Sequence, residues 1–243
     1  MSYTDAHRMF LQIITSQRIL FGAQVKEAYQ KCCAKYNVDS DSLLNFVVEI
    51  NDKLEPFNLI IKKSIQEEEQ RDVQCFVLVN NLDSDPLKSL NTYTQPERNF
   101  IKKLIEDIVE SNKGSISEIN AINLSHDLER KLSMNDAENV INKLIQGKWL
   151  IRSGDNLHLS VLTTSEMTNY FQDNYSEKCA KCKFCFNITL KGYNCDGCNT
   201  WFHRSCVKSY WKKTQTSVKT CPEEDCGIEW DIEEEASSKR RRP

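Results

Sequence analysis

The sequence predicts an α+β protein in which two winged-helix domains stand in tandem before a small cysteine-rich domain. The winged helices are predicted because each of two segments places amphipathic helices before a two-stranded hairpin. The last domain is predicted because eight of the eleven cysteines fall between Cys179 and Cys226. No cysteine occurs from 76 to 178, so this change in composition marks the clearest domain boundary.

The composition is that of a globular protein. Hydrophobic residues make up 40% and charged residues 28% of the 243 residues. The low counts of glycine (7) and proline (5) exclude low-complexity and collagen-like classes. No apolar run approaches the ~20 residues that cross a bilayer, so we expect no membrane association. The first residues lack a secretory signal, so we expect an intracellular protein with few structural disulfides.

We expect four segments along the chain. They are a first winged helix at 1–95, a second at 96–175, a zinc domain at 176–232 and a disordered tail at 233–243. Residues 1–95 carry 10 basic and 13 acidic side chains, and residues 96–175 carry 9 and 12, a net charge of -3 each. Residues 176–243 carry 13 basic and 10 acidic side chains, a net charge of +3.

The first segment predicts three helices and a hairpin. Its apolar residues recur at helical spacing, a cap at Ser40 or Asp41 precedes the third helix, and Pro56 ends it. The expected elements are helices at 4–17 and 24–36, a third helix whose apolar stripe is Leu43, Leu44, Val47, Val48, Ile50 and Leu54, and strands at 59–64 and 73–79. A polar turn at 67–72 separates the strands, and Cys32, Cys33 and Cys75 fall on apolar patterns that predict buried thiols.

The second segment repeats this plan. The expected elements are helices at 96–111 and 117–131, a short strand at Ile116, a helix from Met134 that Gly147 ends, strands at 149–152 and 157–160, and a helix at 164–173. Ser133 begins a capping-box-like sequence. Because the hairpin follows the third helix both times, a winged helix is favoured over a generic helical core.

The charges argue against DNA binding by these domains. The third helix of a winged helix often enters the major groove, which requires a basic surplus. Residues 41–55 contain four acidic side chains and one lysine, and residues 133–148 contain two of each sign. We therefore expect these domains to bind protein, and direct DNA binding by this chain is not expected.

The cysteine-rich segment predicts two zinc sites. Four pairs of ligands occur in order, and the two-residue gaps aim both side chains of a pair at one tetrahedral ion. The pairs are Cys182 and Cys185, Cys195 and Cys198, His203 and Cys206, and Cys221 and Cys226. In a cross-brace, the first and third pairs hold one Zn²⁺ and the second and fourth pairs hold the other. Sequential pairing is the alternative.

Cys179 is left over from this pattern. It also forms a two-residue gap with Cys182, so the register of the first pair is ambiguous. We prefer the pair Cys182 and Cys185, because Phe184 then stands before the second ligand, where such knuckles often present an apolar side chain. Cys179 is then a spare thiol.

The zinc pattern resembles both RING and PHD fingers. The stretch at 198–206 is PHD-like, but a PHD finger usually has tryptophan two residues before the seventh ligand, where this chain has Lys219. The aromatic cage of a methyl-lysine reader is also missing, apart from Tyr193. A RING-like domain is therefore favoured.

Three residues resemble the groove with which a RING domain contacts a ubiquitin-conjugating enzyme. They are Phe184, Trp211 and Pro222. The alternative is that they pack the domain's small core. Active RING domains often carry a basic residue after the last ligand, and here that residue is Gly227.

Tandem winged helices before a four-Cys, one-His, three-Cys module resemble the non-SMC element one subunits of the SMC five/six chromosome-maintenance complex. The resemblance covers nearly the whole chain and is most specific at 182–206. The four-residue gap between Cys221 and Cys226 departs from the usual two residues.

The resemblance implies a MAGE-type partner bound by the winged helices, a kleisin partner, and a nuclear role in DNA repair and recombination. It also implies RING-type E3 ubiquitin transferase activity, in which no side chain is catalytic and the conjugating enzyme is only positioned. The alternative is a non-catalytic structural subunit whose zinc module mediates protein interaction. The basic cluster at 239–242 is either a nuclear import signal or a solvated end.

Overall fold

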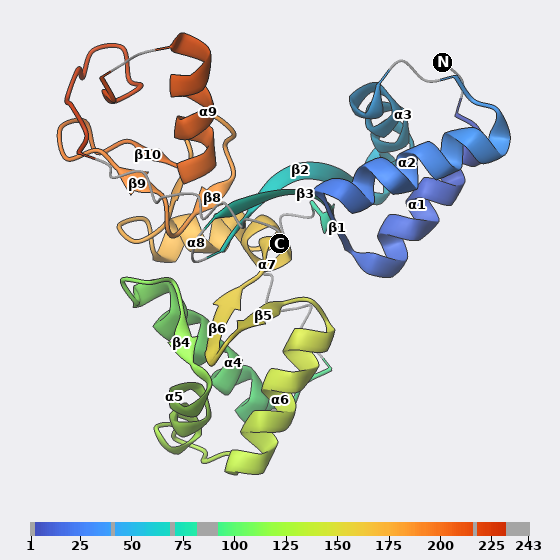
Figure 1. Ribbon diagram of the computed structural model, residues 1–243. Coiled ribbons are helices and arrows are strands. Elements are labelled where there is room, and N and C mark those ends of the chain that lie inside the picture. Colours follow the sequence, from blue (N-terminus) through green and yellow to red (C-terminus); the bar gives the residue numbers. More distant parts are fainter. Residues whose placement is uncertain (1–2, 40–41, 69–70, 82–91, 216–217, 232–243) are drawn as a thin grey trace, which may run out of the picture.

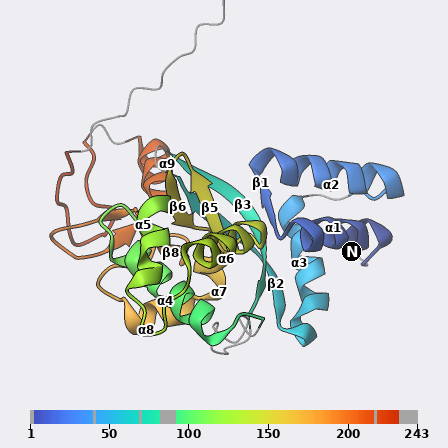
Figure 2. The same ribbon diagram turned by 90° about the horizontal axis from the view of Figure 1, so that it is seen from below.

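The computed structural model describes residues 3–39, 42–68, 71–81, 92–215 and 218–231. A long antiparallel hairpin lies at its centre and is made of β2 (Leu59–Glu67) and β3 (Asp72–Asn80) (Figure 1). At one end of the hairpin lie α1 (Asp5–Gln17), α2 (Gly22–Tyr36) and α3 (Leu43–Leu54). Figure 2 shows these three helices at one side of the molecule and the labelled helices from α4 to α9 at the other.

The three helices and the hairpin form the first winged helix, in which β2 and β3 are the wing. A short strand, β1 (Ile19–Phe21), joins the sheet in the order β1-β3-β2. Glu67 stands opposite Asp72 at the closed end of the wing. The core between the helices and the sheet buries Phe10, Ile14, Leu20, Val25, Phe46, Ile50, Ile61 and Phe76.

The ends of these helices have identifiable causes. α3 begins at Leu43 because the Ser42 hydroxyl accepts a hydrogen bond from the Asn45 amide at 3.2 Å. The prediction of Ser40 or Asp41 as the cap is therefore wrong, and these two residues lie outside the described part of the chain. Pro56 follows in a 3₁₀ turn, since proline cannot continue an α-helix.

The second winged helix repeats the arrangement with a shorter wing. Its elements are α4 (Gln95–Glu110), β4 (Ile116–Ser117), α5 (Glu118–Asn123), α6 (Met134–Gln146), β5 (Leu150–Ser153) and β6 (Asn156–Leu159). The sheet order is β4-β6-β5. As predicted, Ser133 caps α6, with its hydroxyl accepting from the Asp136 amide at 3.1 Å.

The helix predicted at 117–131 is shorter than expected. It ends at Asn123, and Leu124–His126 continues as a 3₁₀ turn. The prediction counted Ile119 as part of an apolar stripe, but this side chain is 74% exposed. From 125 to 131 only Leu128 is apolar, so no further helical turn has a face to bury.

The single helix predicted at 164–173 is two helices, α7 (Val161–Glu166) and α8 (Thr168–Asn174). α7 packs on the first wing, where Val161 and Leu162 share a buried cluster with Val77 and Val79. The amide oxygen of Gln66 accepts a hydrogen bond from the Val161 amide at 2.6 Å, and its Nε2 donates to the Leu159 carbonyl at 3.4 Å. β2 is thereby joined to the second winged helix.

The cysteine-rich region forms small strand pairs and one helix. Its elements are β7 (Ala180–Lys181), β8 (Ile188–Thr189), β9 (Tyr193–Asn194), β10 (Trp201–Phe202) and α9 (Arg204–Thr214). β7 pairs with β8, and β9 pairs with β10. An aromatic cluster of Phe202, Trp211 and Trp230 packs between the cysteine pairs.

Two of the three early cysteines are buried as predicted. Cys32 and Cys75 lie in the core, whereas Cys33 is only half-buried. Burial raises the pKa of Cys75 to about 12, and its thiol donates to the Ser64 carbonyl at 3.5 Å.

Among the described helices, none combines the length and apolar character that crossing a membrane requires. The predicted domain boundaries at 95, 175 and 232 stay predictions. Cys179 and Ile188 share one buried cluster with α4 and α6, so the cysteine-rich region packs closely on the second winged helix.

Candidate metal centre

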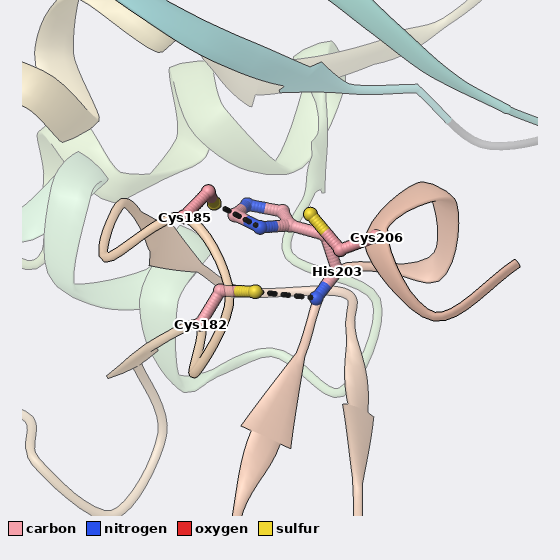
Figure 3. Close-up of side chains that lie close together, drawn as sticks. All are labelled: Cys182, Cys185, His203 and Cys206. Atoms are coloured by element: carbon pink, nitrogen blue, oxygen red, sulfur yellow. Dashed lines mark hydrogen bonds between the residues drawn. The ribbon is translucent and has the colours of Figure 1, made fainter. Parts of the chain in front are cut away.

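The first cluster joins Cys182, Cys185, His203 and Cys206. Their ligand atoms all lie within 4.8 Å of one another. The first two cysteines come from the loop between β7 and β8, His203 is the N-cap of α9, and Cys206 lies in its first turn. Figure 3 shows the four side chains directed toward one another.

A tight backbone knuckle aims the first two thiols. The Cys182 amide donates to the Asn187 carbonyl at 2.9 Å, and the Phe186 amide donates to the Cys182 carbonyl at 2.8 Å. Phe186 has the left-handed φ of 59° that closes the turn. The second pair repeats this geometry, since the Asn199 amide donates to the Cys195 carbonyl at 2.7 Å and Asn199 has φ 53°.

The His203 ring is oriented by its own hydrogen bonds. Its Nε2 lies 3.1 Å from the Ile188 carbonyl, which can only accept, so Nε2 carries the proton. Nδ1 lies 3.2 Å from the Cys185 sulfur, so it is the ring nitrogen that faces the other ligands (Figure 3). Holding one ring nitrogen on a carbonyl is the usual way a protein directs the other toward a metal.

Crowding of the donors moves their pKa values apart. Hydrogen bonds from Cys185 and Cys206 lower the pKa of Cys182, whereas the bond to Cys182 raises the pKa of Cys206. A thiolate is therefore stabilised at Cys182. The thiolate is the form of cysteine that binds a metal ion.

The second cluster joins Cys195, Cys198, Cys221 and Cys226. The Cys195 and Cys226 sulfurs are 3.5 Å apart, and the Cys198 and Cys221 sulfurs are 3.7 Å apart. The wider gap before Cys226 is closed by a turn, in which the Cys226 amide donates to the Glu223 carbonyl at 3.1 Å. The unusual spacing therefore still brings four thiols together.

Both clusters fit Zn²⁺. Sulfurs at about 2.3 Å from a tetrahedral zinc lie about 3.8 Å from each other, close to the separations here, whereas a disulfide requires about 2.05 Å. Three cysteines with one histidine, and four cysteines, are the donor sets of structural zinc. The clusters follow the cross-brace pairing and not the sequential one. The role of the eight residues as zinc ligands stays a prediction.

Cys179 stands apart from both clusters. Its thiol donates to the carbonyls of Phe171 at 3.4 Å and Tyr175 at 3.2 Å, within the core of the second winged helix. Burial raises its pKa to about 11. The knuckle is formed by Cys182 and Cys185, and Cys179 is a core thiol.

The three residues of the predicted groove differ in exposure. Phe184 is 38% exposed and stacks on Tyr210 with ring centroids 5.4 Å apart. Trp211 is 7% exposed, packs edge-on against Trp230, and donates from Nε1 to the Thr220 carbonyl at 2.9 Å. Trp211 thus has the packing role that was the alternative, and Pro222 is half-buried. Contact of these residues with a conjugating enzyme stays a prediction.

The backbone explains why glycine follows the last ligand. Gly227 has a φ of 62°, a left-handed backbone conformation that residues other than glycine rarely adopt. A basic residue at this position would be strained. The departure noted in the sequence is therefore tied to the turn that closes the second cluster.

Sequence reasoning missed two contributors to this region. Trp230, four residues after the last ligand, packs on Tyr193, Phe202 and Trp211, and an aromatic residue so close to a ligand was an available signal. The wing residues Glu67 and Asp72 also reach this region, and the sequence assigned them only to a polar turn. A groove of about 440 Å³ between the wing and α9 is lined by Lys63, Ile65, Gln74, Phe184, Tyr210 and Lys213, among others.

Two family patterns match the chain. Residues 7–161 match the family described as Nse1 non-SMC component of SMC5-6 complex. Residues 182–226 match the family described as RING-like domain. The first match spans more than half of the chain, and the second begins at Cys182 and ends at Cys226.

Relatives of known name are similar over nearly the whole chain. The non-structural maintenance of chromosomes element 1 homolog of Rattus norvegicus is 30% identical over 230 residues, which cover 93% of this chain and 84% of the relative. The Homo sapiens homolog is 29% identical with the same coverage. A chain of a solved Nse1-Nse3-Nse4 complex aligns with a TM-score of 0.76 and 26% identity, covering 96% of this chain and 99% of that one.

Proposed function

The chain belongs to the Nse1 family of non-SMC components of the SMC5-6 complex, and from this membership we propose that it is a RING-type ubiquitin ligase subunit of such a complex. The observation that carries the ligase proposal is the RING-like cross-brace with an exposed aromatic side chain, Phe184, on its first knuckle. A role in DNA repair and recombination is part of the proposal.

The proposed partners are a MAGE-type subunit, corresponding to Nse3, and a kleisin, corresponding to Nse4. The likeness to a chain of the Nse1-Nse3-Nse4 complex supports them. On the first winged helix, Leu44 and Val48 are exposed one turn apart on α3. An apolar pair in this position suits a protein partner better than DNA.

Assembly is tested by co-expressing the chain with the two subunits and measuring the complex by size-exclusion chromatography with light scattering. We expect a stable ternary complex, which Leu44→Glu with Val48→Glu weakens. Lys26→Glu with Gln30→Glu, exposed on α2 at the same spacing, is the matched control. A chain that elutes alone in the presence of both subunits contradicts the assembly proposal.

The proposed mechanism requires no nucleophile in this chain. Bound zinc would supply structure, by closing both knuckles and fixing α9 against them. Phe184, supported by Phe202 and Tyr210, would then dock the conjugating enzyme, and transfer would be accelerated by orientation of its ubiquitin thioester. This explains why the site needs a rigid surface and no general base.

Reconstituted ubiquitination with the MAGE-type partner tests the ligase proposal. We expect Phe184→Ala to reduce ubiquitin transfer about tenfold, as loss of a buried aromatic anchor would. Phe186→Ala, which removes a more exposed ring from the same knuckle, is the matched control. The absence of transfer with every conjugating enzyme tried, in the assembled complex, contradicts it.

The second candidate is a non-catalytic subunit whose zinc module mediates protein contact. Two observations favour it. Trp211 is buried in the core of the domain, and Gly227 cannot be exchanged for a basic residue without backbone strain. In that case Phe184→Ala lowers the affinity for a protein partner while no transfer exists to lose.

A nuclear location is proposed together with this function. The basic residues 239–242 lie outside the described residues. Microscopy of a fluorescent fusion with these four residues replaced by alanine tests whether they carry the import signal. Unchanged nuclear accumulation assigns import to a partner or to another segment.

A further inference from the structure

The tip of the first wing ends in two carboxylates directed into the zinc domain. Glu67 is the last residue of β2, and Asp72 is the first residue of β3 opposite it. The two acids therefore lie side by side at paired positions of one hairpin. Asp72 contacts the start of the helix that carries Cys206, and Glu67 contacts the segment next to the carbonyl that orients His203.

Glu67 holds the segment after β8. Its carboxylate accepts hydrogen bonds from the Leu190 amide at 2.8 Å, from the Lys191 amide at 3.2 Å and from the Thr189 hydroxyl. The residue immediately before this segment is Ile188, whose carbonyl orients the His203 ring. Glu67 thereby fixes the strand that sets the direction of a ligand nitrogen.

Asp72 holds the start of α9. Its Oδ2 accepts from the Ser205 amide at 2.7 Å, and its Oδ1 accepts from the Arg204 guanidinium at 3.2 Å. The Asp72 side chain is fully buried, so this ion pair is shielded from water. A carboxylate at a helix N-terminus is stabilised by the free amides there. This helix begins with the ligand His203 at its N-cap and carries Cys206 in its first turn.

Two further hydrogen bonds join the same surfaces. The Arg204 guanidinium donates to the Glu68 carbonyl, and the Asn187 side chain donates to the Lys63 carbonyl at 3.3 Å. Residues 195–200 and 220–231, which carry the second cluster, by contrast make no hydrogen bond to the described parts of the winged helices. The wing supports one cluster and leaves the other alone.

We infer that the wing of the first winged helix holds the ligands of the first metal site in their binding geometry. Glu67 and Asp72 are positioning residues that set the placement of His203 and Cys206. Retention of metal by the first cluster then depends on a domain more than 100 residues away in the chain. The second cluster retains its metal without that help. The inference holds whether or not the protein transfers ubiquitin.

The physical reason is the cost of misplacing ligands. Partners that hold a metal ligand from outside commonly contribute 10–100-fold to metal affinity, because they keep the ligand in its binding geometry. Removing one charge of a buried, hydrogen-bonded pair also leaves the other charge uncompensated. Replacing either acid by its amide keeps the shape but loses the charge that attracts two or more donors.

The test uses the full chain loaded with cadmium-113 in place of zinc. The resonance of this nucleus moves with the number of sulfur ligands, so the Cys₃His and Cys₄ clusters are followed separately by NMR. The variants are Glu67→Gln and Asp72→Asn. The matched control is Glu68→Gln, the neighbour of Glu67, whose half-exposed side chain pairs with Arg71.

On addition of excess EDTA, we expect the Cys₃His signal to decay about tenfold faster in either variant, while the Cys₄ rate and the control stay at the wild-type value. Equal acceleration of both signals overturns the inference, because the acids would then only stabilise the domain as a whole. Unchanged rates in Glu67→Gln also overturn it. That variant decides the result if Asp72→Asn does not fold.

Discussion

The two cysteine clusters share a knuckle at their first pair of ligands and the same pattern of burial, yet they differ in what surrounds them. In each cluster two ligands are buried and two are half-buried. The first is enclosed by the wing of another domain, through Glu67 and Asp72. The second is closed by its own chain, through the turn at Cys226. Two clusters with similar burial are therefore held in place differently, the first by a segment distant in the sequence and the second by residues close to its own ligands.

Metal removal should have the largest effect on the stability of the cysteine-rich domain, since it empties both clusters at once. Three of the four tryptophans, Trp201, Trp211 and Trp230, lie in the zinc domain. A chelator should unfold this domain, because so small a core cannot stand without metal. We expect a large red shift of tryptophan fluorescence while the far-UV circular dichroism of the winged helices persists. Loss of the whole helical signal would show that the winged helices also depend on the metals.

Single-ligand substitutions should separate the clusters. Cys206→Ser and Cys226→Ser are each expected to lose about one zinc per chain. Only Cys206→Ser should also release the wing, because α9 and the segment after β8 lose their fixed positions. Hydrogen exchange of the Leu190 amide, which donates to Glu67, reports this release. Equal hydrogen-exchange rates of the Leu190 amide in both variants would mean that the two clusters fold as one unit and do not differ in their dependence on the wing.

Trp211 connects the two clusters. It lies on the helix that carries Cys206, and its indole donates to Thr220, the residue before Cys221. Trp211→Ala should destabilise the zinc domain by about 3–5 kcal/mol, the usual cost of deleting a buried tryptophan. Urea denaturation followed through the fluorescence of the remaining tryptophans, of which Trp201 and Trp230 lie in the zinc domain, measures it. A change within about 0.5 kcal/mol would return Trp211 to the surface role that the sequence first favoured.

The smallest effect is expected at Gly227. Gly227→Arg supplies the basic residue common in active RING domains but forces a side chain into a left-handed conformation, at a cost of about 1–2 kcal/mol. Asp225→Arg adds a basic side chain nearby without that strain and is the control. The melting temperature should be lowered only by Gly227→Arg. Equal melting temperatures would show that the turn adapts and that the basic residue is absent for another reason.

The parts predicted from the sequence are those that local spacing determines. Two-residue gaps place both thiols of a knuckle, and the order of the pairs indicates the cross-brace. Helical periodicity located α1, α2, α3, α4 and α6 to within one or two residues. It failed at 117–131, where a polar run followed a short helix, and at β1, whose three residues are too few to show a strand pattern.

The parts that sequence reasoning could not reach depend on contacts between distant segments. Phe184, Trp211 and Pro222 occupy similar places in the pattern, but only packing against Trp230 shows that Trp211 faces inward. Glu67 and Asp72 look like solvated turn residues, since such acidic runs usually are. Their partners lie more than 100 residues further along the chain, and no local pattern links them.

Gln66 and Glu67 are neighbours on β2 but contact different domains. Successive side chains of a strand point to opposite faces, so Gln66 binds the second winged helix while Glu67 binds the zinc domain. A single codon inserted or deleted within 59–65 would exchange these two faces and detach both neighbours at once. Across the evolution of this chain, length changes in the hairpin should therefore be confined to the turn that follows Glu67.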